Sequence, residues 1–149
     1  NLPEIDGDPT MLRQAFLNLA LNACQAMPGG GTLRIAARAV PPQRVEVTFE
    51  DTGVGIRPEH LGRIFDLYFT TREKGSGIGL SMVYRTVQLH DGEIEVQSVE
   101  GTGTTFRLHW EFPCVTAGEA ARLNAPGAGT LMEGGPDPLE GCRVLVCED

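Results

Sequence analysis

Two asparagines one helical turn apart are the first residues whose type and spacing could do chemistry. Asn18 and Asn22 stand at positions i and i+4 of a helical pattern, so both carboxamides emerge on one side of the helix, beside Gln14 and Gln25. Asparagine is unfavourable inside a helix, so a pair of them among leucines and alanines needs a reason, and a shared site is one. The alternative is a pair of polar side chains on a solvated helix face.

A carboxylate followed by a glycine turn ends a later strand pattern. In segment 51–56, Asp51 could accept a hydrogen bond from an exocyclic amine, while Gly53 and Gly55 would let a flat ring approach the backbone. An ordinary turn closed by the aspartate side chain would explain the same residues.

Two glycine-rich segments follow. Segment 70–80 leads directly into a helical pattern, so its backbone amides, with Arg72 and Lys74 nearby, could cradle an anion. Its spacing differs from that of a P-loop and of a Rossmann turn. Segment 100–106 places hydroxyls beside glycines between two strand patterns. A flexible loop and a tight hairpin would explain these two segments equally well.

Two helices must position the asparagines and segment 70–80. Asp8 and Pro9 are typical of a helix start, and apolar residues at helical spacing continue to Ala26, where a glycine-rich stretch ends the pattern. The spacing predicts a second helix over 79–89, with Gly92 as its C-terminal stop.

Two strand pairs complete the predicted fold. Apolar residues alternate over 32–40 and 44–51, and again over 93–99 and 104–112. The order of helix, strand pair, loop-rich middle, helix and strand pair predicts an α+β fold, with helices layered on one face of a mixed or antiparallel sheet.

The composition excludes several classes of function. The 149 residues are 41% hydrophobic and 21% charged, and no apolar run approaches the roughly 20 residues that a membrane span needs. With 12 basic and 20 acidic residues the formal net charge is -8, so a nucleic-acid partner is not expected. A nucleotide could still bind through local amides, cations and Mg²⁺.

The cysteines and the N-terminus predict a reduced, cytoplasmic chain. The four cysteines form no Cys-x-x-Cys pair, and the first residues lack a basic stretch followed by an apolar one. Cys24 lies inside the helical pattern and is expected to pack in the core rather than react.

The composition changes after Pro113. Six glycines and three prolines between residues 117 and 141 predict a linker over 114–141. Residues 142–149 then form a short apolar strand pattern that ends in Glu148 and Asp149.

In their order along the chain, these segments resemble the N, G1, F, G2 and G3 boxes of the ATP-binding catalytic domain of sensor histidine kinases, within the fold shared by gyrase, Hsp90 and MutL. Segment 64–72 is similar to the F box of kinases related to the nitrogen-regulation sensors. The resemblance implies a catalytic domain over 1–113, folded as a two-layer α/β sandwich with a mixed, mainly antiparallel sheet covered on one face by helices. It also implies ATP or ADP with Mg²⁺, bound between the helices and a lid.

The resemblance implies roles for individual residues. Asn22 matches the magnesium ligand, and Asn18 matches a position that faces the phosphates. Asp51 matches the carboxylate that reads adenine, with Thr104 as a second contact near the base. The remaining residues would shape the base pocket and the phosphate lid: Gly53, Gly55, Ile56, Thr71, Arg72, Gly75, Gly77, Gly79 and Leu80.

Asn18 separates kinases from ATPases of this fold. The ATPases generally carry glutamate at the matching position, where it can deprotonate water, and a carboxamide cannot act as that base. Asn18 and Arg72 would therefore serve phosphoryl transfer to a protein histidine, through positioning and charge neutralisation. A non-catalytic module whose lid closes on nucleotide stays the alternative, and an ATPase of this fold is disfavoured.

The expected partners follow from the same resemblance. No phosphoacceptor motif surrounds His60, His90 or His109, which we expect to be structural or solvated, so the chain alone is not expected to autophosphorylate. The resemblance implies a phosphoacceptor and dimerisation domain elsewhere in the same protein, a monomeric fragment and a homodimeric parent, with membrane anchoring of the parent left open. Segment 142–149 resembles the first strand of a response-regulator receiver, which would make the parent a hybrid kinase.

Overall fold

The computed structural model describes residues 7–72 and 75–111, and the backbone of residues 142–148. Both predicted helices and all four paired strands are confirmed to within one residue at each end. The elements are α1 (Pro9–Ala26), β1 (Gly31–Val40), β2 (Arg44–Asp51), α2 (Pro58–Leu61), α3 (Gly79–Leu89), β3 (Gly92–Val99), β4 (Gly103–Glu111) and β5 (Cys142–Glu148).

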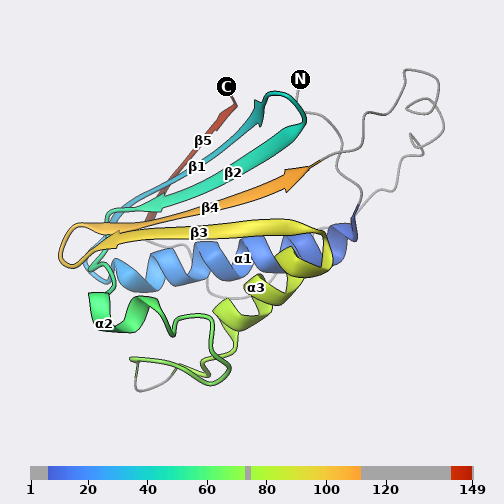
Figure 1. Ribbon diagram of the computed structural model, residues 1–149. Helices are drawn as coiled ribbons and strands as arrows, with labels where there is room; N and C mark the ends of the chain where they lie inside the picture. The colour runs from blue at the N-terminus through green and yellow to red at the C-terminus, as the bar shows by residue number, and fades with distance from the viewer. Residues whose placement is uncertain (1–6, 73–74, 112–141, 149) are drawn as a thin grey trace, which may run out of the picture.

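The five strands form one sheet in the order β3-β4-β2-β1-β5. The three pairs among β1 to β4 are antiparallel and β5 lies parallel to β1, so the sheet is mixed and mainly antiparallel, as expected. Figure 1 shows α1 and α3 side by side along one face of this sheet. The predicted α+β sandwich is therefore confirmed.

α1 starts and packs as its sequence predicts. The Asp8 carboxylate accepts hydrogen bonds from the N–H groups of Thr10 at 2.8 Å and Met11 at 3.2 Å, and Pro9 fills the first turn. Residues three or four apart are buried against the sheet, which leaves both asparagines on the flank of the helix: Leu12, Ala15, Leu19 and Ala23. Cys24, expected in the core, is only half-buried.

A histidine ties the two long helices together. The Nε2 atom of His90, just after α3, accepts the N–H of Asp8 at 2.9 Å, and its Nδ1 lies 2.7 Å from the carbonyl oxygen of Thr86. Because Nε2 accepts, the ring proton is on Nδ1 and donates to Thr86. The start of α1 is thereby fixed to the end of α3.

Gly92 is not the stop of α3, contrary to the prediction. His90 caps the helix, and Asp91 takes the left-handed conformation with φ 52°. Gly92 is the first residue of β3, where a Cβ would lie 2.6 Å from Nε1 of Trp110. Trp110, 2% exposed, is part of the core, so the glycine makes room for its indole rather than for a turn.

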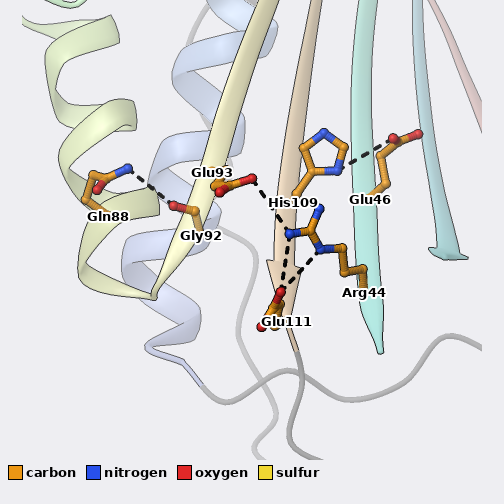
Figure 2. Close-up of polar contacts among 7 residues, drawn as sticks. All are labelled: Arg44, Glu46, Gln88, Gly92, Glu93, His109 and Glu111. Carbon is orange, nitrogen blue, oxygen red and sulfur yellow. Dashed lines mark hydrogen bonds and ion pairs between the residues drawn. The ribbon is translucent and has the colours of Figure 1, made fainter. Parts of the chain in front are cut away.

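The other face of the sheet carries charged pairs across the strands. Figure 2 shows Arg44 of β2 contacting Glu111 of β4 at 3.2 Å and Glu93 of β3 at 3.9 Å. One row further along, Nδ1 of His109 lies 3.6 Å from Glu46. This face is held by polar pairs, while the apolar face lies against α1 and α3.

Three features lie beyond the sequence prediction. The four-residue helix α2 was not predicted, and β5 joins the sheet as the edge strand beside β1, from Gly31 opposite Cys142 to Ala37 opposite Glu148. The assignment of β5 to a receiver domain stays a prediction, and the linker and Asp149 fall outside the described residues. No helix in the described part of the chain is long and apolar enough to cross a membrane.

Candidate functional site

A cleft of about 830 Å³ lies beside α1, at the ends of β2 and β4, and is also lined by residues of segments 54–72 and 75–80. Its size is typical of small-molecule sites. Twelve of the thirteen predicted site residues line it: Asn18, Asn22, Asp51, Gly55, Ile56, Thr71, Arg72, Gly75, Gly77, Gly79, Leu80 and Thr104.

Asp51 is a buried carboxylate at one end of the cleft. Only 7% of the residue is exposed, and its Oδ1 accepts the N–H of Gly53 at 2.9 Å. Burial raises the pKa of Asp51, and the N–H groups of Gly53 and Thr104 and the charge of Arg72 oppose that shift. A desolvated acceptor of this kind suits a hydrogen-bond donor on an otherwise flat ligand.

A hydroxyl pair lies next to Asp51. Thr104 stands opposite both Asp51 and Ser98 in the sheet, and the hydroxyls of Ser98 and Thr104 are 2.9 Å apart. Ser98 donates to the carbonyl of Gly103 at 3.0 Å, so its one proton is used and Thr104 is the donor to Ser98. Ser98 also accepts the N–H of Ile56 at 2.8 Å, which fixes the loop after β2.

Gly53 and Gly55 serve different purposes in that loop. A Cβ on Gly55, which has φ 70°, would lie 2.2 Å from the carbonyl oxygen of Val99, so the loop can lie against the end of β3 only with glycine there. Gly53 does not line the cleft; a Cβ there would lie 2.6 Å from the carbonyl oxygen of Ala26. Gly53 therefore packs on the end of α1 and orients Asp51.

The asparagine pair lines the cleft from the flank of α1. Nδ2 of Asn18 donates to the carbonyl of Gly79 at 3.5 Å, so it links α1 to the start of α3. Oδ1 of Asn22 accepts from Nη1 of Arg72 at 3.1 Å. Burial lowers the pKa of Arg72, while the charge of Asp51 raises it. The Asp51 carboxylate and the Arg72 guanidinium therefore interact electrostatically within one cleft.

The described part of the glycine-rich lid, residues 75–78, leads into the start of α3. Gly77, with φ 67°, accepts the Tyr68 N–H at 2.9 Å, and a Cβ on it would lie 2.3 Å from the carbonyl carbon of Tyr68. Among the described residues no side chain caps the first turn of α3, while the N–H of Ile78, just before the helix, donates to Oγ of Ser76 at 3.4 Å. Gly79 and Leu80 at the helix start line the cleft. The backbone amides of a helix start favour an anionic group.

Two contributors to the site were missed by the sequence prediction. Ser98 gave no signal, because only the pairing of β3 with β4 brings it to Thr104. Gln25 was noted beside the asparagines but given no role, and its Oε1 accepts a hydrogen bond from Nη1 of Arg72. The i+3 spacing of Gln25 after Asn22 could have indicated a shared contact.

The three histidines have structural contacts. His60 lines the cleft, with Nε2 3.1 Å from Nη2 of Arg57 and its ring 5.5 Å from that of Phe69. His90 joins the helices, and His109 is paired with Glu46.

The residues present fit an adenine nucleotide and a hard cation. The cavity is lined by a buried carboxylate acceptor, an amide oxygen, an arginine and a helix N-terminus. An amide oxygen is a suitable ligand for Mg²⁺, which otherwise relies on phosphates and water.

Comparison with known proteins gives one family. The model of histidine kinase-, DNA gyrase B- and HSP90-like ATPases matches residues 7–113. The sensor histidine kinase ZraS of Escherichia coli is 44% identical over 107 residues, which are 72% of this chain and 23% of ZraS. The curated relatives are matched over 15% to 23% of their own length, so this chain spans only a small part of them.

Solved structures agree with that match. The catalytic domain of the histidine kinase ThkA, in a nucleotide-free form, superposes with a TM-score of 0.65 at 30% identity, covering 73% of each chain. Full-length ShkA in complex with AMPPNP gives a TM-score of 0.68 at 34% identity, over 78% of this chain and 24% of that one.

Proposed function

The chain belongs to the family of histidine kinase-, DNA gyrase B- and HSP90-like ATPases, a nucleotide-binding family, and we propose that it is the catalytic domain of a histidine kinase. In this proposal it binds Mg-ATP and passes the γ-phosphoryl group to a histidine on a separate phosphoacceptor domain of the same protein. The observation that carries the proposal is one cleft lined both by buried Asp51 and by Asn18, Asn22 and Arg72.

Asp51 would select the base. Its desolvated carboxylate would accept a hydrogen bond from the exocyclic amine of adenine, while guanine presents a carbonyl oxygen at that position and would be repelled. The Thr104 hydroxyl lies beside it as a second polar group, and Gly55 lets the loop backbone form a flat wall.

The α1 flank and the lid would position the phosphates. The exposed amides at the start of α3 and the guanidinium of Arg72 supply positive potential, and Asn18 holds the start of α3 against α1. Asn22 would hold the Mg²⁺ ion through Oδ1, and the ion would neutralise phosphate charge. A nitrogen of the acceptor histidine would then bond to the γ-phosphorus as the bond to the bridging oxygen breaks and ADP leaves.

Hydrolysis of ATP is disfavoured by the residue types with which α1 lines the cleft. Of the described residues that line the cleft, the carboxylates are Asp51 and Glu100, and a Cβ on Gly55 would lie 3.0 Å from Cα of Glu100, beside the loop that follows Asp51. No carboxylate of α1 lines the cleft, so a water molecule near the phosphates has no base there. We therefore expect negligible phosphate release from ATP by the chain alone.

The proposal extends to partners that the chain does not contain. The phosphoacceptor domain would supply dimerisation, and a receiver domain would accept the phosphoryl group from the histidine. The magnesium ion and these partners are part of the proposal, as is a membrane-anchored, homodimeric parent.

A transfer assay tests the function. The chain is mixed with the phosphoacceptor domain of its parent kinase and ATP labelled in the γ-phosphoryl group. We expect acid-labile label on that domain and not on the chain. Tight ATP binding with no transfer would favour the non-catalytic nucleotide-dependent module, and rapid phosphate release would favour an ATPase.

A further inference from the structure

Arg72 is held by the C-terminal part of α1. Its Nη1 donates to Oδ1 of Asn22 at 3.1 Å and to Oε1 of Gln25, and its Nη2 donates to the carbonyl oxygen of Asn22 at 3.2 Å. α1 has no basic residue in its last turn, so the guanidinium also supplies the positive charge that favours a helix C-terminus.

The backbone of Arg72 is set for this contact. The Arg72 N–H donates to Oγ1 of Thr70 at 3.1 Å, and the Arg72 carbonyl accepts the N–H of Gly75 at 3.1 Å. Thr70 and Gly75 therefore hold the backbone of Arg72, whose guanidinium bridges this part of the chain and α1.

One oxygen in this cluster has two uses. Oδ1 of Asn22 is the atom that would hold Mg²⁺ in the proposed function, and here it accepts a hydrogen bond from a guanidinium. A metal ion about 2.1 Å from that oxygen and an arginine nitrogen 3.1 Å from it would bring two cations close together. Arg72 and the metal ion therefore compete for Asn22.

We infer that Gln25 is a positioning residue that holds Arg72 against Oδ1 of Asn22, the proposed metal ligand, until Mg-nucleotide binds. The inference rests on the proposed function. Arg72 must leave Asn22 and Gln25 before Asn22 can hold the ion, and its guanidinium is then free to turn to the phosphates. Gln25 sets how readily this exchange takes place, so it tunes the dependence of nucleotide binding on magnesium.

The substitution Gln25→Ala tests this inference. Calorimetry gives the dissociation constant of ADP in chelator and in Mg²⁺, and their ratio is the magnesium increment. Because Gln25→Ala removes one acceptor of Arg72 and leaves Asn22 intact, we expect the increment to rise about threefold to tenfold. Gln25 is exposed on α1 and alanine favours helix, so the variant is expected to fold.

A matched control and an independent readout accompany the titration. Gln97→Ala removes an exposed glutamine from β3 and should leave the increment unchanged. In the ligand-free protein, the Nη1–H signals of Arg72 in a nitrogen-15 NMR spectrum should lose protection from exchange in Gln25→Ala only, because Nη1 is the atom that donates to Gln25.

The outcomes separate this inference from the proposed function. A wild-type protein without ADP binding, or without a magnesium increment, would overturn the proposed function and this inference with it. A wild-type increment that is unchanged or smaller in Gln25→Ala would overturn the role of Gln25 alone.

Discussion

At the scale of single residues, the burial of Asp51 has opposite effects on stability and on ligand binding. The pKa of Asp51 is raised above 3.8, so the folded state binds a proton more tightly than the unfolded state does. The stability of the ligand-free protein should therefore fall as pH rises from the usual value through the raised pKa. At neutral pH the ionised carboxylate destabilises the fold and is available as an acceptor.

Replacing Asp51 by asparagine should separate these effects. Asp51→Asn is expected to raise the free energy of unfolding of the ligand-free protein at pH 7. It should weaken ADP binding by about 1.5 to 3 kcal/mol, roughly tenfold to more than a hundredfold, because a charge-assisted hydrogen bond is lost. Chemical denaturation and calorimetry measure the two quantities. The control Asp91→Asn, at an exposed left-handed position that asparagine tolerates, should change neither. A folded Asp51→Asn with wild-type affinity would remove Asp51 from the site.

Asn22 belongs to the same scale, with a different expected result. Asn22→Ala should keep most of the ADP affinity in chelator, lose the magnesium increment and fail to phosphorylate an added phosphoacceptor domain. Its free energy of unfolding should stay within about 1 kcal/mol of wild type, because higher helix propensity offsets the lost contact with Arg72. An intact increment together with intact transfer would make Asn22 merely a polar residue of the helix flank.

At the scale of elements, the lid depends on one left-handed glycine. Gly77→Ala puts a Cβ 2.3 Å from the Tyr68 carbonyl carbon at φ 67°, so the turn that closes the cleft must shift. We expect ADP affinity to fall about tenfold while the free energy of unfolding falls by only about 1 kcal/mol, since the lid is exposed. The control Gly62→Ala has open space and φ -72°, and should bind ADP normally. Equal affinities in calorimetry would show that the lid does not contribute to binding.

The sheet has its own pH dependence through Glu46. A 2.7 Å hydrogen bond from Arg38 lowers the pKa of Glu46, against the effect of burial. The ionised form therefore adds stability above the usual value of 4.5, and this contribution is lost as pH falls through the lowered pKa. Glu46→Gln should cost about 1 kcal/mol at pH 7, since Arg38 is half-exposed, and the cost should shrink in acid. Urea titrations at pH 7 and pH 3.5 measure this, with exposed Glu95→Gln as control. A difference that does not vary with pH would contradict the assignment.

Periodicity predicted the elements but not their tertiary contacts. α1, α3 and the four paired strands have local signals: an Asp-Pro helix start, apolar spacing and glycine turns. α2 has four residues, too few for a periodic pattern. The role predicted for Gly92 was wrong, because the residue that requires a glycine there, Trp110, lies eighteen positions later in the chain. Ser98 and Gln25 have roles only through Thr104 and Arg72, which the fold brings to them.

At the scale of the whole molecule, the sheet brings distant segments into one cleft. β2 and β4 place Asp51 opposite Thr104, while α1 carries the asparagine pair and segment 54–80 carries Arg72 and the lid. The order of the motifs along the chain and the family resemblance predicted twelve residues that the fold brings to this cleft. The roles of these residues are part of the proposed function. β5 extends the sheet on the edge beyond β1, away from β3 and β4.

The central claim is that this cleft binds adenine nucleotide with magnesium, with Asp51 reading the base. The most direct measurement is a calorimetric titration of the wild-type chain with ADP and with GDP, each in Mg²⁺ and in chelator. We expect ADP to bind with a 1:1 stoichiometry, more tightly in Mg²⁺, and GDP to bind at least about tenfold more weakly, because its carbonyl oxygen meets the Asp51 carboxylate. Equal affinities for ADP and GDP, or no ADP binding by the folded chain, would contradict the account.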